Sequence, residues 1–123
     1  MSRGWILDLH LEDSTDDEAW YTVRAHGWQE GLIREKSPLV GRVPIERTTR
    51  RYDFELGGAW SQEAIPEHQL SGRCPYLEHQ DALNELHRSI VQFEYRWWFY
   101  QLVRAVAQAL ASESFPKNVF RYQ

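Results

Sequence analysis

The 123-residue chain lacks most features that would indicate a particular environment or chemistry. Its single cysteine, Cys74, excludes an intramolecular disulfide and a zinc site built from several cysteines. No apolar run approaches the roughly 20 residues that cross a bilayer. The N-terminal region contains acids and no long apolar stretch, unlike a secretory signal. We therefore expect a cytoplasmic protein that does not associate with membranes.

Motifs of catalysis and cofactor binding are also missing. The sequence contains no GxSxG, P-loop or GxGxxG pattern. His79 and His87 are eight residues apart, not the three or four that place two ligands on one helical face. The acidic segment 12–18 lacks the ligand spacing and central glycine of a calcium loop. We therefore predict no metal site and no cofactor.

Positive charge is scarce, since the chain has 14 Lys and Arg residues against 18 Asp and Glu residues, and its net charge is −4. Such a protein is not drawn electrostatically to nucleic acid or to anionic membranes. The one basic cluster, interspersed with acids and threonines, comprises Arg42, Arg47, Arg50 and Arg51. We interpret it as a solvated strand face, and nucleic-acid binding through Arg42–Arg51 as the least favoured function.

What the chain does contain is typical of a globular protein, with 42% hydrophobic and 26% charged residues. Its length predicts a single domain over residues 1–123. The aromatic share of 14%, including six Trp, is high. Trp and Tyr serve protein cores and binding surfaces equally well, so composition does not separate these two uses.

The first half of the chain has the alternation of β-strands. Apolar residues occupy every second position in the first segment, at Trp5, Leu7, Leu9 and Leu11. The polar residues 13–17 predict a turn, and residues 19–26 predict a second strand that completes an antiparallel hairpin. Residues 45–56 predict a further strand that ends at Gly57, and residues 59–75 a long connection.

The second half is dominated by residues 76–115, which contain neither glycine nor proline. Apolar side chains recur there at steps of three and four and predict one helix from Asp81 to Ala111, ended by Pro116. Such a helix would be ~46 Å long, whereas a domain of this size is roughly 35 Å across. It must therefore bend or split, or its overhang must pack on a second subunit as a homodimer. The predicted fold class is α+β, an antiparallel sheet of three to five strands packed against one long C-terminal helix.

Two polar residues interrupt the apolar side of this helix. Glu94 lies beside the apolar stripe, where burial would raise the pKa of its carboxyl and suit it to acid–base catalysis. The favoured interpretation of Glu94 is nevertheless a structural carboxylate that pairs with an arginine of the sheet or reaches solvent. Arg104 lies on the stripe, where it would grip a carboxylate or phosphate, or extend to solvent. The candidate binding residues are Glu94, Trp97, Trp98, Tyr100 and Arg104, with Arg50 and Arg51 from the basic cluster.

The favoured function is a non-catalytic interaction module, such as an inhibitor, an immunity-type protein or an adaptor subunit. Small size, acidic charge, missing catalytic motifs and a surplus of Trp and Tyr support this interpretation, because aromatic residues are enriched at binding hot spots. The alternative is a small enzyme or ligand-binding domain. Its pocket, between sheet and helix, would be lined by Glu94, Trp97, Trp98 and Arg104.

Overall fold

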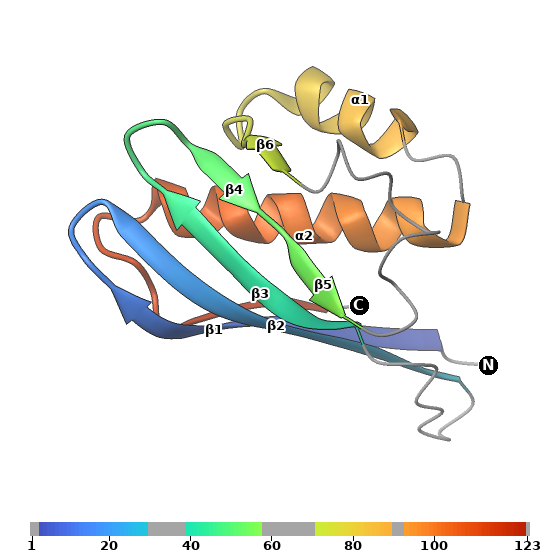
Figure 1. Cartoon of the computed structure of the whole chain (residues 1–123). Helices are drawn as coiled ribbons and strands as arrows, with labels where there is room; N and C mark the ends of the chain where they lie inside the picture. The colour runs from blue at the N-terminus through green and yellow to red at the C-terminus, as the bar shows by residue number, and fades with distance from the viewer. Residues whose placement is uncertain (1–2, 30–38, 58–70, 90–92, 123) are drawn as a thin grey trace.

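The computed structural model describes residues 3–29, 39–57, 71–89 and 93–122 (Figure 1). The described segments contain strands and helices in the order β1 (Arg3–Ser14), β2 (Glu18–Gln29), β3 (Leu39–Glu46), β4 (Arg51–Asp53), β5 (Glu55–Gly57), β6 (Ser71–Arg73), α1 (Gln80–Ser89), α2 (Phe93–Ala111) and β7 (Asn118–Tyr122). The predicted α+β class is confirmed.

All described strand pairs are antiparallel and belong to one sheet, in the order β6-β4-β3-β2-β1-β7. Strand β5 pairs with β3 next to β4, so the seven strands occupy six positions across the sheet. The expectation of three to five strands was too low. Strand β6 has only three residues, too few to show an alternating pattern, and the five residues of β7 do not alternate in polarity.

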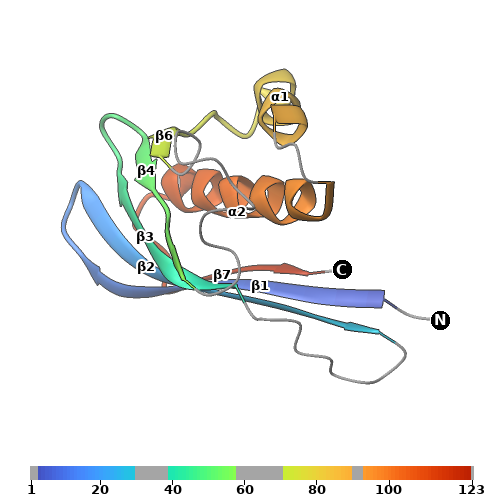
Figure 2. The same cartoon turned by 45° about the vertical axis from the view of Figure 1, so that its right-hand side comes forward.

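The N-terminal hairpin forms as its sequence predicts. Strands β1 and β2 pair antiparallel with Leu9 opposite Val23, and an irregularity shifts the register between Leu11 and Asp13. The side chains of Leu7, Leu9 and Val23 are fully buried, and the sheet to which they belong is covered by α2 (Figure 2). Alternation therefore placed the apolar face of this hairpin correctly.

The single strand expected over residues 45–56 is wrong. Strand β3 ends at Glu46, and a turn over residues 47–50 reverses the chain before β4 begins. The Asp17 carboxylate holds this turn, since it accepts hydrogen bonds from the Thr48 backbone N–H at 2.9 Å and from the Thr48 hydroxyl. Arg50 completes the turn with a φ of 58°, a conformation that non-glycine residues rarely adopt.

The single long C-terminal helix is also wrong, because the chain forms two helices instead. Helix α1 runs back along α2 on the side away from the sheet (Figures 1 and 2). The linking residues 90–92 lie outside the described part of the chain. Helix α2 has 19 residues, or ~28 Å, and fits within the domain. The reason for expecting an overhanging helix and a homodimer therefore disappears.

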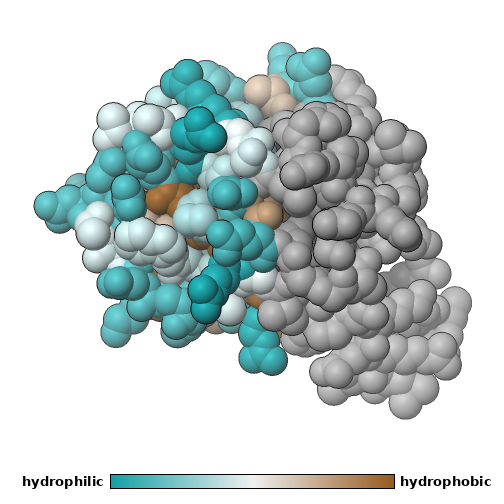
Figure 3. All heavy atoms as spheres, in the orientation of Figure 1, coloured by the Kyte–Doolittle hydropathy of each residue, from teal (hydrophilic) through white to brown (hydrophobic). Residues whose placement is uncertain are grey.

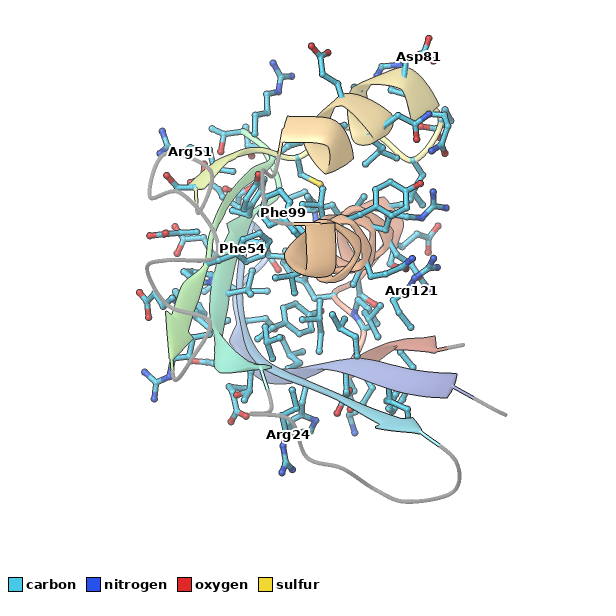
Figure 4. All side chains as sticks on the ribbon, turned by 90° about the vertical axis from the view of Figure 1, so that its right-hand side faces the viewer. Arg24, Arg51, Phe54, Asp81, Phe99 and Arg121 are labelled. Atoms are coloured by element: carbon cyan, nitrogen blue, oxygen red, sulfur yellow. The ribbon has the colours of Figure 1, made fainter. Side chains whose placement is uncertain are left out.

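Helix α2 lies between the two other parts of the fold. The sheet curves around one side of it and α1 covers the opposite side (Figures 2 and 4). This position explains why the second half of α2 is apolar almost all round. Its buried apolar residues are Phe99, Leu102, Val103, Ala105, Val106, Ala107, Ala109 and Leu110.

Aromatic contacts join the sheet to α2. The rings of Tyr52 and Phe54 have centroids 4.6 Å apart, and Phe54 meets Phe99 edge-on at 5.8 Å. Figure 4 shows Phe54 and Phe99 pointing toward each other between the sheet and the helix. All three side chains are buried. Part of the aromatic surplus therefore serves the core rather than a surface.

Candidate functional site

The candidate residues from the helix divide into two groups. The side chains of Glu94, Trp97 and Trp98 lie outside the described part of the chain. Tyr100 and Arg104 are described, half-buried, and in contact with each other. The site on this side of the molecule is therefore built from Tyr100 and Arg104 outward.

A hydrogen-bond network links Tyr100 and Arg104 of α2 to Gln80, the first residue of α1. The Tyr100 hydroxyl accepts from Gln80 Nε2 at 2.7 Å and from Arg104 Nη1 at 3.0 Å. Arg104 Nη1 also donates a hydrogen bond to Gln80 Oε1 at 3.2 Å. Sequence reasoning missed Gln80, because its role follows from the folding of α1 back onto α2.

Strand β7 brings a second arginine, Arg121, close enough to this network for its charge to act on Tyr100 and Arg104. Arg121 Nε donates to Gln101 Oε1 of α2 at 2.8 Å. Gln101 is buried, while Arg121 and Arg104 are half-buried. Figure 4 shows Arg121 beside α2, on the concave side of the sheet. We call Gln80, Tyr100, Gln101, Arg104 and Arg121 the arginine cluster.

The two guanidinium charges influence the neighbouring groups. Burial of the Tyr100 hydroxyl opposes its ionisation. The hydrogen bonds from Gln80 and Arg104 and the charges of Arg104 and Arg121 outweigh burial and lower the pKa of Tyr100. Burial, and next the charge of Arg104, lower the pKa of Arg121. The cluster is therefore a place where negative charge is favoured and positive charge is in excess.

Arg50 has a different role from the one expected. Its side chain is only 7% exposed and donates from Nε to the Cys74 carbonyl at 2.9 Å and from Nη2 to the Pro75 carbonyl at 3.1 Å. Its guanidinium also stacks 3.9 Å from the centre of the Tyr76 ring. Arg50 thus fastens the segment before α1 to the sheet and is not on a binding surface.

The other arginines of the basic cluster do not combine into one surface. Arg47 stacks 4.3 Å from the centre of the Phe115 ring and donates to the Glu113 carbonyl at 2.6 Å. Arg42 and Arg51 are exposed on the helix-free face of the sheet. Arg42 is paired in register with Glu55. The four arginines therefore lie in different surroundings and do not form one continuous basic patch of the kind that nucleic-acid binding uses.

Cys74 is buried in the core. Burial raises the pKa of its thiol to about 11, although the Arg50 charge and hydrogen bond oppose this rise. A thiol with such a pKa carries little thiolate at neutral pH and is a poor nucleophile.

A second surface, which sequence reasoning missed, lies on the helix-free face of the sheet. It is an open depression of about 260 Å³. The lining residues come from β2, β3 and β4 and are Glu18, Trp20, Pro44, Ile45, Glu46, Arg51, Tyr52 and Asp53. Trp20 is 37% exposed. The alternation of β2 could have revealed this surface from the sequence, since it places Trp20 on the opposite face from the buried Tyr21 and Val23.

The acids around this depression have no partners within the described segments. Neither hydrogen bonds nor ion pairs engage the carboxylates of Glu18, Glu46 and Asp53 there. Glu18 lies directly opposite Glu46 in the β2–β3 register, where like charges repel. We call Glu18, Trp20, Pro44, Glu46 and Asp53 the Trp20 surface.

Comparison with protein families, curated proteins and solved structures finds no match. Within the described segments, neither helix is long and apolar enough to cross a membrane. No three His, Cys, Asp or Glu residues gather there in a way that could hold a metal ion.

Proposed function

We propose that this protein is a non-catalytic interaction module that binds a basic partner protein through the Trp20 surface. Inhibitors, immunity-type proteins and adaptor subunits work in this way. The observation that carries the proposal is an exposed Trp20 in an open depression whose acids are unpaired.

The composition of this surface fits a binding hot spot. Trp is the residue type most enriched among residues that dominate binding energy, and hot spots are ringed by polar groups that exclude water. Trp20 is opposite Pro44 in the β2–β3 register, so two rigid side chains form the apolar centre. Regularly paired strands hold both residues, which limits the entropy that binding would cost.

The charge around Trp20 indicates the nature of the partner. Three acids, Glu18, Glu46 and Asp53, face one base, Arg51, at the rim of the depression. The whole chain also carries a net charge of −4. Complementary charge accelerates association and discriminates against wrong partners. A partner that presents basic residues around an apolar side chain would neutralise Glu18 and Glu46 together.

On the side shown in Figure 3, the described surface outside the depression has little apolar area to which a partner could bind instead. It is mainly hydrophilic there, with only small separate apolar areas. A cytoplasmic location, expected from the sequence, remains part of this proposal.

The test is capture of a partner from extract of the native host, followed by titration of the purified partner. We expect Trp20→Ala to weaken the complex by roughly tenfold or more. The matched control is Phe120→Ala, which alters another exposed aromatic on the same face, four strand positions from β4. This control should bind as the wild type does.

A charge reversal, Glu46→Lys, should slow association and reduce its dependence on salt. Circular dichroism would confirm that each variant is folded. A captured protein that binds the Trp20→Ala variant as tightly as the wild type would contradict the proposal. Equal losses in the Trp20 and Phe120 variants would contradict it as well.

A further inference from the structure

The arginine cluster has more positive charge than the fold requires. The hydrogen bonds of Arg104 and Arg121 go to the Tyr100 hydroxyl and to the amides of Gln80 and Gln101, all of which are neutral. Within the described segments, neither arginine pairs with a carboxylate. Buried or half-buried arginines normally have such a partner, because removing two like charges from water without one is unfavourable.

Donors are also left over. A guanidinium carries five N–H groups, yet the network uses only Nη1 of Arg104 and Nε of Arg121. Arg104 Nε is buried and has no hydrogen-bond partner. An unpaired buried donor is costly, and a native structure that keeps one requires an explanation.

We propose that the arginine cluster binds an oxyanion, a phosphate or carboxylate group, between Arg104 and Arg121. The planar fork of arginine matches both groups through paired N–H···O bonds. A bound oxyanion would neutralise the two charges and accept from the unused donors. The Tyr100 hydroxyl accepts hydrogen bonds from Gln80 and Arg104 and so helps to hold the Arg104 guanidinium in place.

A purely structural role explains only part of this arrangement. The bond from Arg121 to Gln101 fastens β7 to α2, and Arg104 stacks on Tyr100 at 5.5 Å. Neutral side chains would supply similar packing without placing two positive charges close together. The site is separate from the Trp20 surface, because the sheet lies between them (Figure 4). Its occupation can therefore be tested independently of a protein partner.

The test is titration of the protein with inorganic phosphate at constant ionic strength, while NMR follows the arginine Nε–H signals. We expect saturable shifts of the Arg104 and Arg121 signals, and no equivalent effect of chloride. A parallel titration with succinate separates the two ligand classes, since saturation by phosphate or by succinate alone identifies the preferred group. Shifts that grow linearly with every salt alike would overturn the proposal.

Variants assign the binding to the cluster. Arg104→Gln and Arg121→Gln should each weaken phosphate or succinate binding about tenfold or more, since a charge-assisted hydrogen-bond partner is lost. The matched control, Arg24→Gln, removes an exposed arginine from the opposite face of the sheet and should leave binding unchanged. If a Gln variant unfolds, Arg104→Lys keeps the charge without the fork and should still bind more weakly.

The Tyr100 hydroxyl provides a second readout. Its pKa is lowered partly by the charges of Arg104 and Arg121. A bound oxyanion would screen these charges, so phosphate or succinate should raise the pKa of Tyr100 in an absorbance titration. The Tyr100→Phe variant identifies which transition belongs to this residue. An unchanged Tyr100 pKa at saturating anion would contradict binding at the cluster.

Discussion

The two faces of the sheet are made by the same strands, yet the side chains on one face are buried and those on the other are largely exposed. On the face toward α2, Leu9 and Val23 are fully enclosed and have no contact left to make. On the other face, Trp20 is partly exposed and the carboxylates of Glu18 and Glu46 are unpaired. The covered face therefore accounts for stability, whereas the open face is the one through which we propose that a partner binds.

The largest expected effect comes from breaking the covered face. Leu9→Ala should lower the free energy of unfolding by about 2–5 kcal/mol, because it removes a fully buried side chain and leaves a cavity. Arg24→Ala, an exposed change on the open face, should stay within about 0.5 kcal/mol. Urea unfolding followed by circular dichroism measures both. Similar losses in the two variants would show that the faces do not differ as described.

Arg50 and Arg51 allow the same comparison within one amino-acid type. They are adjacent in sequence, but Arg50 is buried and Arg51 is exposed. Arg50→Ala should cost about 2–3 kcal/mol, since the Cys74 and Pro75 carbonyls lose a charged donor. Arg51→Ala changes an exposed side chain and should cost about 0.5 kcal/mol or less. Thermal unfolding of the two variants provides the measurement. Equal destabilisation would mean that the hydrogen bonds of Arg50 contribute little.

Alkaline pH should weaken the covered face selectively. Burial, and next the nearby Cys74 charge, raise the pKa of Tyr52 from 10.0 to about 12. Its contribution to stability is therefore complete below pH 10 and is lost as pH rises through about 12. The urea midpoint of the wild type should fall across this range. Tyr52→Phe, which keeps the ring, should flatten the decline, and an unchanged slope would exclude Tyr52 as its cause.

The smallest expected effect is a gain in stability on the open face. Glu46→Gln removes the repulsion from Glu18 and should raise the free energy of unfolding by about 0.2–1 kcal/mol. Glu55→Gln, opposite Arg42 in the β3–β5 register, should give no gain, because it removes an attraction instead. Differential scanning calorimetry at low salt compares the two variants. A gain from both, or from neither, would show that Glu18 and Glu46 do not repel each other as their register implies.

The sequence was most informative where local pattern and tertiary environment agree. The period of two in β1 and β2 predicted their pairing and buried face, because one face of that hairpin packs on the core. The apolar periodicity near Phe99 likewise predicted a buried helix. In both places, each residue's own polarity decided its position.

Prediction failed where distant contacts decide the local conformation. The turn before β4 contains no glycine or proline, and its Arg50 keeps a positive φ while bonded to Cys74 and Pro75. Asp17, from the β1–β2 turn, secures the same turn at Thr48. The absence of helix breakers in residues 76–115 permitted one helix but did not require it, since packing of α1 on α2 favours a reversal.

The candidate sites show the same limit. Arg104 could be singled out as a polar residue on an apolar stripe, but Gln80 and Arg121 reach it only through α1 and β7. Trp20 was within a correctly predicted strand, yet its surroundings depend on β3 and β4.

The pairing of β7 with β1 has a consequence for how the chain acquires its structure. The first and last described strands are adjacent, so residues 118–122 must exist before the sheet is complete. While the chain is being synthesised, Leu7 and Leu9 of the β1–β2 hairpin remain exposed until α2 has been made and can pack on the sheet. Contacts between such distant segments are slow to form, and the growing chain therefore passes through a stage in which a chaperone could recognise its exposed apolar face.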